Sequence, residues 1–153
     1  MKQIKRFSMC LVALMISVAT YAADNNDALV GKWVQTLTES GITVVTSYEF
    51  MPDGEMVQVL NMVGTSPKVE IAGTARCKYE YKKNTIKFKF QPKDIDIEKF
   101  EIEGLPDGMA MMAIEQQKAE MAKMEQKLTD VKIEGNLLTA KLGNETITLI
   151  KVE

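Results

Sequence analysis

The chain has 153 residues, a formal net charge of −2 and 46% hydrophobic residues, which is enough apolar material for one core of ordinary size. It contains no histidine, and this argues against Ser-His-acid and Cys-His catalysis and against the usual zinc sites. The slightly acidic charge balance argues against a nucleic-acid partner.

The first residues carry the three parts of an export signal in the expected order. Residues 2–6 hold three positive charges, residues 9–19 are apolar apart from one serine, and Thr20-Tyr21-Ala22 offers small residues before a cleavage point. The apolar run is shorter than the roughly 20 residues that cross a bilayer. We therefore expect residues 1–22 to be a cleaved signal peptide, and the protein to be periplasmic or secreted without stable membrane insertion.

Cleavage after Ala22 would change the charge and the thiol content of the chain. It would remove three positive charges and no acids, leaving 16 Lys and Arg against 21 Asp and Glu, a net charge of −5. It would also remove Cys10 and leave Cys77 as the single thiol, so that no intramolecular disulfide could form. Cys77 alternates inward with Ala75 and Tyr79, and we expect it to pack as a small hydrophobic side chain rather than to react.

After a short polar leader at residues 23–28, runs of alternating apolar and polar residues follow one another, separated by Gly, Asn, Asp and Pro turn signals. This pattern is typical of an all-β, up-and-down antiparallel β-barrel, and residues 29–153 are expected to form one such domain. The expected strands, about 8–9 in number, are 29–38, 42–50, 55–63, 68–81, 85–90, 94–103, 130–134, 137–142 and 145–152.

The run from 94 to 103 changes the phase of its alternation. Ile95 and Ile97 share one parity, whereas Phe100 and Ile102 share the other. Because one added residue reverses the face that a strand presents, this shift predicts a β-bulge at Glu98-Lys99.

One segment, residues 108–127, has a helical rather than a β composition. It is rich in Ala, Met, Glu, Gln and Lys and follows Pro106-Asp107, a typical helix start, so an α-helix is predicted within an insertion at residues 106–128. Its apolar positions form one stripe at helical spacing: Ala110, Ile114, Met121, Met124 and Leu128. The helix precedes the last three strands and is expected to lie over an end or side of the barrel.

Gly31-Lys32-Trp33, early in the first strand, resembles the Gly-x-Trp signature that opens lipocalin-type barrels. The Trp33 ring is expected to plug the closed end of the barrel, on the inward face with Leu29 and Leu37. Residues 50–55 and 79–86 are similar to hairpins of the small exported lipocalin-like, calycin-type domains common in Bacteroidetes-type bacteria. The resemblance implies the barrel fold; many members of that group have no assigned activity, and it implies no particular ligand.

Two features depart from lipocalins proper. Those proteins usually pair the opening Trp with an Arg late in the barrel, whereas the only Arg outside the signal is Arg76, mid-chain and expected to face outward. Their helix also follows the barrel strands, whereas residues 108–127 precede the last three strands.

The sequence favours an exported, non-enzymatic binding protein without a cofactor, holding a small apolar or amphipathic molecule in the barrel or under the helix. The candidate ligand-binding side chains are Trp33, Tyr48, Phe50, Tyr79, Tyr81, Phe88, Ile114, Met121 and Met124. The same bulky aromatic side chains would also suit a completely filled interior, so a cavity and a solid core are both open.

Two alternatives follow from the same features. A solid core would favour a protein–protein interaction domain of the cell envelope that binds through its outer face or its helix. The methionines of the helix, which include Met109, Met111 and Met112, also suggest soft-metal handling because thioethers bind Cu(I). Methionine more often fills adaptable apolar interfaces.

Overall fold

The computed structural model describes residues 27–123 and 125–153. The expected export signal and Met124 therefore lie outside the described residues. The described part forms nine strands, with the helix α2 between the sixth and the seventh.

The elements follow one another closely along the chain. Their bounds are β1 (Gly31–Glu39), β2 (Ile42–Phe50), β3 (Glu55–Thr65), β4 (Lys68–Lys82), β5 (Thr85–Phe88), the 3₁₀ turn η1 (Pro92–Asp94), β6 (Ile95–Ile102), α2 (Asp107–Lys123), β7 (Gln126–Glu134), β8 (Leu137–Leu142) and β9 (Glu145–Val152). A short helical stretch at residues 27–29 precedes β1.

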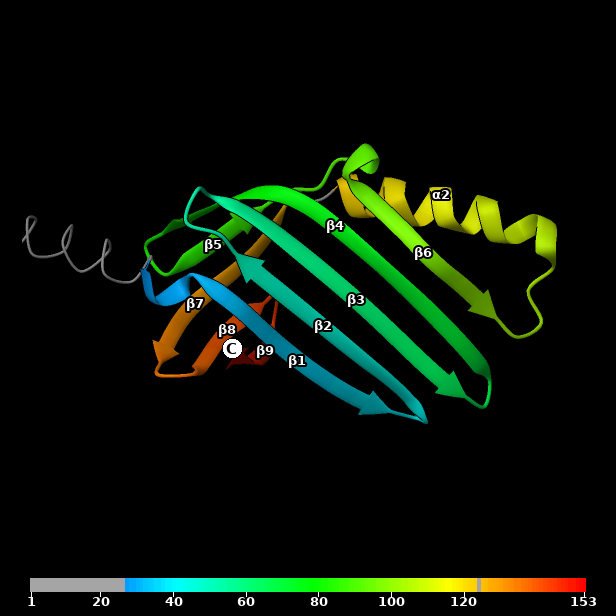
Figure 1. The fold of residues 1–153 in the computed structure, drawn as a ribbon, viewed down its shortest axis with the longest axis horizontal. Helices are drawn as coiled ribbons and strands as arrows, with labels where there is room; N and C mark the ends of the chain where they lie inside the picture. The colour runs from blue at the N-terminus through cyan, green and yellow to red at the C-terminus, as the bar shows by residue number, and fades with distance from the viewer. Residues whose placement is uncertain (1–26, 124) are drawn as a thin grey trace, which may run out of the picture.

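Eight of the strands close into an antiparallel barrel in the order β3-β2-β1-β9-β8-β7-β5-β4, with β3 pairing back to β4 (Figure 1). The ninth strand, β6, lies outside this ring and pairs with β4. Closure of the barrel pairs the backbone N–H and C=O groups that the edge strands of an open sheet would leave without hydrogen bonds. The predicted all-β barrel with one inserted helix is confirmed.

The long strands run on past the closed part of the barrel. β1 pairs with β2 over its whole length but with β9 only over Lys32–Val34. One edge of β4 pairs first with β6, from Val69 to Ala75, and then with β5, from Tyr79 to Lys82. The far halves of β1 to β4, together with β6, therefore extend beyond β5 and β7 to β9 (Figure 1), and we call this part the overhang.

The closed part of the barrel is filled with side chains. Trp33, Leu29, Ile86, Leu138 and Leu149 are completely buried. Aromatic rings pack edge to face around them, with ring centroids 5.0 Å apart for Phe50 and Tyr79 and 5.5 Å apart for Phe88 and Phe90. Of the two options open from the sequence, a solid core describes this part of the barrel.

Leu37 corrects one detail of the predicted plug. Leu29 and Trp33 are fully buried as expected, but Leu37 is 56% exposed. It lies on the same face of β1 as Trp33, beyond the last residue that pairs with β9. Leu37 therefore belongs to the overhang and not to the barrel core.

The predicted bulge in β6 is confirmed. Ala72 pairs with Lys99, whereas the next residue, Gly73, pairs with Ile97, so that Glu98 is the added residue. The added residue keeps Ile97 and Phe100 on the same inner face in spite of their different parity.

The helix ends earlier than the composition predicted. α2 ends at Lys123 rather than near Lys127, and β7 already begins at Gln126. Leu128, expected on the helical stripe, is instead a β7 residue that pairs with Ile86 and is 1% exposed. Burial of Leu128 in the barrel core outweighs the helix propensity of the residues before it.

The closed end of the barrel has a cation above Trp33 although no late arginine exists. Lys151, in the last strand, places its Nζ 5.2 Å from the centre of the Trp33 ring and donates a hydrogen bond to the Ala28 carbonyl oxygen at 3.2 Å. Trp33 Nε1 donates to the Leu29 carbonyl oxygen at 2.7 Å. Lys151 of the last strand thus covers the Trp33 ring at this end of the barrel.

Candidate functional site

An apolar pocket of about 210 Å³ lies between the inner face of the overhang and α2. Its lining comes from three strands and the helix: Gln58, Leu60 and Met62 of β3, Ile71, Gly73, Thr74 and Ala75 of β4, Ile95, Ile97 and Phe100 of β6, and Gln117 and Met121 of α2. Of these lining residues none is charged. The pocket is therefore suited to an uncharged, largely apolar occupant.

The pocket begins where the solid core ends. Ala75 and Ile95, which line it, also belong to the buried core of the barrel. Farther along the same strands, Ile71, Met62 and Phe100 are only half-buried. The inner face of the overhang thus continues the inner face of the barrel core. Side chains fill the space beside it in the barrel but not in the overhang.

Gly73 and the bulge beside it shape the floor of the pocket. A Cβ atom at this position would lie 3.0 Å from the Asp96 carbonyl oxygen and 3.7 Å from Ile97 Cγ1, so β6 approaches the β4 backbone closely here. The absence of a side chain at Gly73 also leaves room between Leu60 and Ile97, its neighbours on β3 and β6. The glycine serves both the packing of the bulge and the volume of the pocket.

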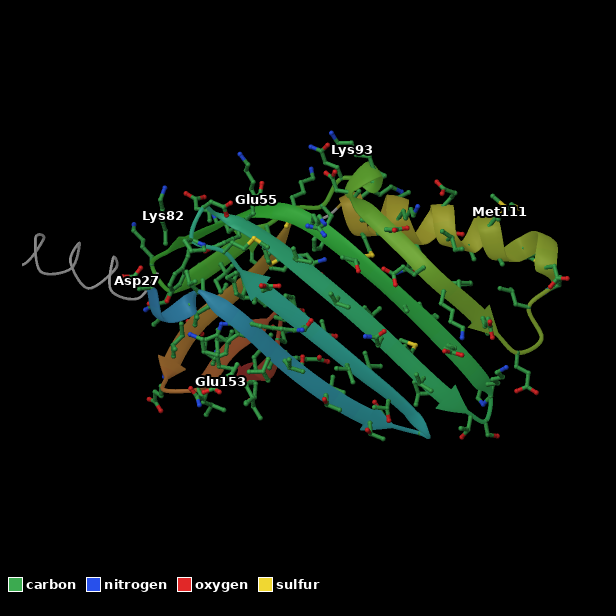
Figure 2. All side chains as sticks on the ribbon, viewed as in Figure 1. Asp27, Glu55, Lys82, Lys93, Met111 and Glu153 are labelled. Atoms are coloured by element: carbon green, nitrogen blue, oxygen red, sulfur yellow. The ribbon has the colours of Figure 1, made fainter. Side chains whose placement is uncertain are left out.

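The helix α2 covers this pocket, but its side chains are only partly buried. Its inner stripe, which includes Ala110, Ile114 and Met121, is half-buried, and no residue of α2 is fully buried. Figure 1 shows α2 running alongside β6, next to η1. On its outer side Met111 is 75% exposed, and Figure 2 shows it at the helix surface.

Gln58 is the polar exception in the pocket lining. Its side-chain Oε1 is buried, and none of the described residues donates a hydrogen bond to it. Buried carbonyl-type oxygens in folded proteins nearly always have a partner, because an unpaired one loses its hydration without compensation. The amide oxygen therefore marks a point at which a bound molecule could gain a hydrogen bond.

The structure separates the candidate side chains of the sequence analysis into two groups. Trp33, Tyr48, Phe50 and Phe88 are buried in the barrel core, and Tyr79 and Tyr81 pack against it. None of these six lines the pocket under α2. Ile114 is half-buried on the inner stripe of α2, Met121 lines the pocket, and Met124 lies outside the described residues.

The tyrosine hydroxyls of the core stay neutral at physiological pH. Burial raises the pKa of Tyr48 and of Tyr81 above its usual value, and burial followed by the nearby Asp53 carboxylate raises the pKa of Tyr79. The Tyr79 hydroxyl donates a hydrogen bond to the Met51 carbonyl oxygen at 2.9 Å. Tyr79 thus has a structural partner, which fits a place in the packed core.

A second and more open groove, of about 480 Å³, lies around Cys77. Its rim carries side chains of both signs, among them Arg76, Lys78 and Asp94, and all but Asp94 of these three are exposed. Mixed exposed charges of this kind are well solvated without a ligand. We therefore place the candidate site under α2.

Cys77 is expected to react slowly with alkylating reagents. Burial raises its pKa to about 11, with a smaller contribution from the Asp94 carboxylate, although a hydrogen bond from the Lys89 backbone lowers it. At pH 8 the reactive thiolate is then roughly a hundredfold scarcer than in an unfolded chain. We expect alkylation of Cys77 by iodoacetamide, followed by peptide mass spectrometry, to be slower by about that factor than in urea, and to accelerate toward pH 11. Equal rates in both states would contradict the buried thiol.

Metal and membrane features complete the description of the site. Among residues 27–123 and 125–153, no group of three or more His, Cys, Asp or Glu side chains is placed to hold a metal ion. The same residues contain no helix long and apolar enough to cross a membrane. Met109, Met111 and Met112, the methionines considered for soft-metal binding, are exposed on the first turns of α2.

No protein-family model and no curated protein sequence matches this chain.

Proposed function

We propose that this chain is an exported, non-enzymatic binding protein that holds a small apolar or amphipathic molecule beneath α2. The observation that carries the proposal is the uncharged pocket of about 210 Å³ between the overhang and the helix. Contact between the apolar lining of this pocket and water is unfavourable in free energy, and a partly apolar occupant would remove that lining from water.

The fold and the sequence support the same proposal from two other directions. A closed antiparallel barrel with a capped end and an open side is consistent with a lipocalin-like fold, in which ligands enter at the open mouth. The Gly-x-Trp start and the signal-like first residues fit a small exported domain of the lipocalin-like group of Bacteroidetes-type bacteria.

Filling the pocket tests the proposal. Leu60→Trp should occupy the pocket and weaken the binding of a small apolar probe, 2-heptanol, at least tenfold, because the added ring takes the ligand's volume. Binding is measured by titrating the probe into labelled protein and following amide chemical shifts by NMR.

A matched control lies on the same strand. Val63→Trp adds the same ring at a 53% exposed position that does not line the pocket, and should leave binding unchanged. Wild-type protein without saturable shifts, or equal binding by both variants, would overturn the proposal. Native mass spectrometry of protein purified from the periplasm would show whether a natural ligand and the proposed export are present.

The helix should respond to an occupant of the pocket. Since α2 has no fully buried residue, its amides are expected to exchange with solvent through local opening. Saturating 2-heptanol should slow hydrogen exchange in residues 113–122 at least severalfold, whereas residues 137–142 of β8, remote from the pocket lining, should not change. Slowing of equal size in both segments would indicate a general effect instead of a covered pocket.

The exposed methionines favour a second candidate function, the binding of an envelope protein through α2. Met109, Met111 and Met112 are 54%, 75% and 72% exposed and lie together on the first turns of the helix. Adaptable methionine surfaces suit apolar partner faces. Photo-crosslinking from position 112 in the cell envelope, compared with position 120 on the same helix, would identify such a partner.

A further inference from the structure

We infer that the pocket under α2 selects small neutral molecules that carry one hydrogen-bond donor, a hydroxyl or an N–H group, and that this donor binds the side-chain oxygen of Gln58. This inference rests on the proposed function and adds the chemistry of the ligand to it.

The buried amide oxygen of Gln58 can accept a hydrogen bond from a molecule in the pocket. The Oε1 atom of Gln58 is buried, and it has no hydrogen-bond partner among the described residues. A hydrocarbon in the pocket would leave this acceptor unpaired, whereas a hydroxyl or N–H group would complete its bonding. A site that can pair a buried polar group discriminates against analogues that lack the matching atom.

The absence of charge in the lining decides the charge of the ligand. A carboxylate offers only acceptors, so it would place a buried negative charge against the Gln58 oxygen. An ammonium group could donate, but of the residues that line the pocket none supplies a carboxylate to balance it. A neutral donor avoids both costs.

The volume of the pocket restricts the size of the ligand. About 210 Å³ is smaller than the ~300 Å³ at which drug-sized sites begin. The pocket therefore encloses about one short alkyl chain or one ring of the ligand.

The strand registers give the orientation of the ligand. Gln58 pairs with Ala75 and with Tyr48, both of which are core residues, so it lies at the inner end of the pocket. Met62 pairs with Ile71 four residues farther along the overhang, where both side chains are half-buried. The donor group therefore enters first, toward the barrel core, and the apolar tail lies toward the open rim.

A matched pair of probes tests the role of the donor. 2-Heptanol and 2-heptanone have the same carbon skeleton and nearly the same volume, but only the alcohol donates a hydrogen bond. We expect the wild-type protein to bind the alcohol roughly tenfold more tightly than the ketone, since one added hydrogen bond to a buried acceptor supports a preference of this size. Dissociation constants are measured by NMR titration for both probes.

Variants of Gln58 test whether this residue is the source of the preference. Gln58→Leu and Gln58→Met remove the acceptor while keeping a side chain of similar size, and both should bind alcohol and ketone equally. The use of two variants protects the test against one that fails to fold. Gln116→Leu removes an exposed glutamine of α2 that does not line the pocket and should keep the preference for the alcohol.

The outcomes separate this inference from the proposed function. Saturable binding of both probes with equal affinity, or an alcohol preference that survives Gln58→Leu and Gln58→Met, would overturn the inference and leave the pocket as a binding site. Binding of neither probe by wild-type protein would overturn the proposed function and the inference with it. A preference for the alcohol that disappears in the Gln58 variants and remains in Gln116→Leu supports both.

Discussion

Trp33→Ala is expected to lower the free energy of unfolding by about 3–5 kcal/mol, the usual range for removing a large buried aromatic side chain. Trp33 is completely buried at the closed end of the barrel. The substitution would leave a cavity there and would also remove the donor to the Leu29 carbonyl oxygen at 2.7 Å. The loss is measured by urea unfolding followed by far-ultraviolet circular dichroism, because Trp33 is the only tryptophan in the chain.

The control for this prediction is a residue four positions farther along β1, on the same face of the strand. Leu37→Ala removes an apolar side chain that is 56% exposed on the overhang, and should cost no more than about 0.5 kcal/mol. If the two variants lose similar stability, the closed end of the barrel is not the packed plug that its burial indicates.

The strand pattern could be predicted well because most strands bury one face and expose the other. Alternation and turn residues placed β2, β8 and β9 at their observed bounds. The change of parity among four apolar residues of β6, three isoleucines and one phenylalanine, located the bulge at Glu98. These features depend on local sequence alone. They follow from the period of two in a strand and from the glycine and asparagine residues that tight turns need.

Apart from Met121 of the helix, the lining of the pocket could not be predicted because it depends on long-range pairing. Which part of β1 is closed by β9, and which part overhangs, follows from a register between segments more than one hundred residues apart in the chain, such as Lys32 with Val152. The sequence left a cavity and a solid core both open for the aromatic residues. Their burial against one another places them in the packed core.

β3 shows why the inner lining was missed even within one strand. Val57, Val59 and Val63 are apolar on its outer face, and Met56, Leu60 and Met62 are apolar on its inner face. With both faces apolar, the alternation does not say which one turns inward. Gln58 was the available signal, since a single polar residue on the methionine and leucine face is unusual for a filled core.

Gly31→Ala is expected to lower the free energy of unfolding by about 2–3 kcal/mol through two separate effects. Gly31 has a φ of +129°, a conformation that residues with a Cβ rarely adopt. A Cβ at this position would also lie 2.6 Å from Lys151 Cε and displace the lysine. The displaced Lys151 would lose its position over the Trp33 ring and its hydrogen bond to the Ala28 carbonyl oxygen.

A double-mutant cycle separates the backbone effect from the lysine effect. In a Lys151→Ala background, Gly31→Ala should cost less than in the wild type, because no lysine remains to be displaced. Gly143→Ala is the control, since Gly143 has a φ of +62° but no atom within 4 Å of the added Cβ, and it should cost only the backbone strain, about 1 kcal/mol. Thermal and urea unfolding measure the four proteins of the cycle and Gly143→Ala. If Gly31→Ala costs no more than Gly143→Ala, Lys151 does not secure the Trp33 end of the barrel.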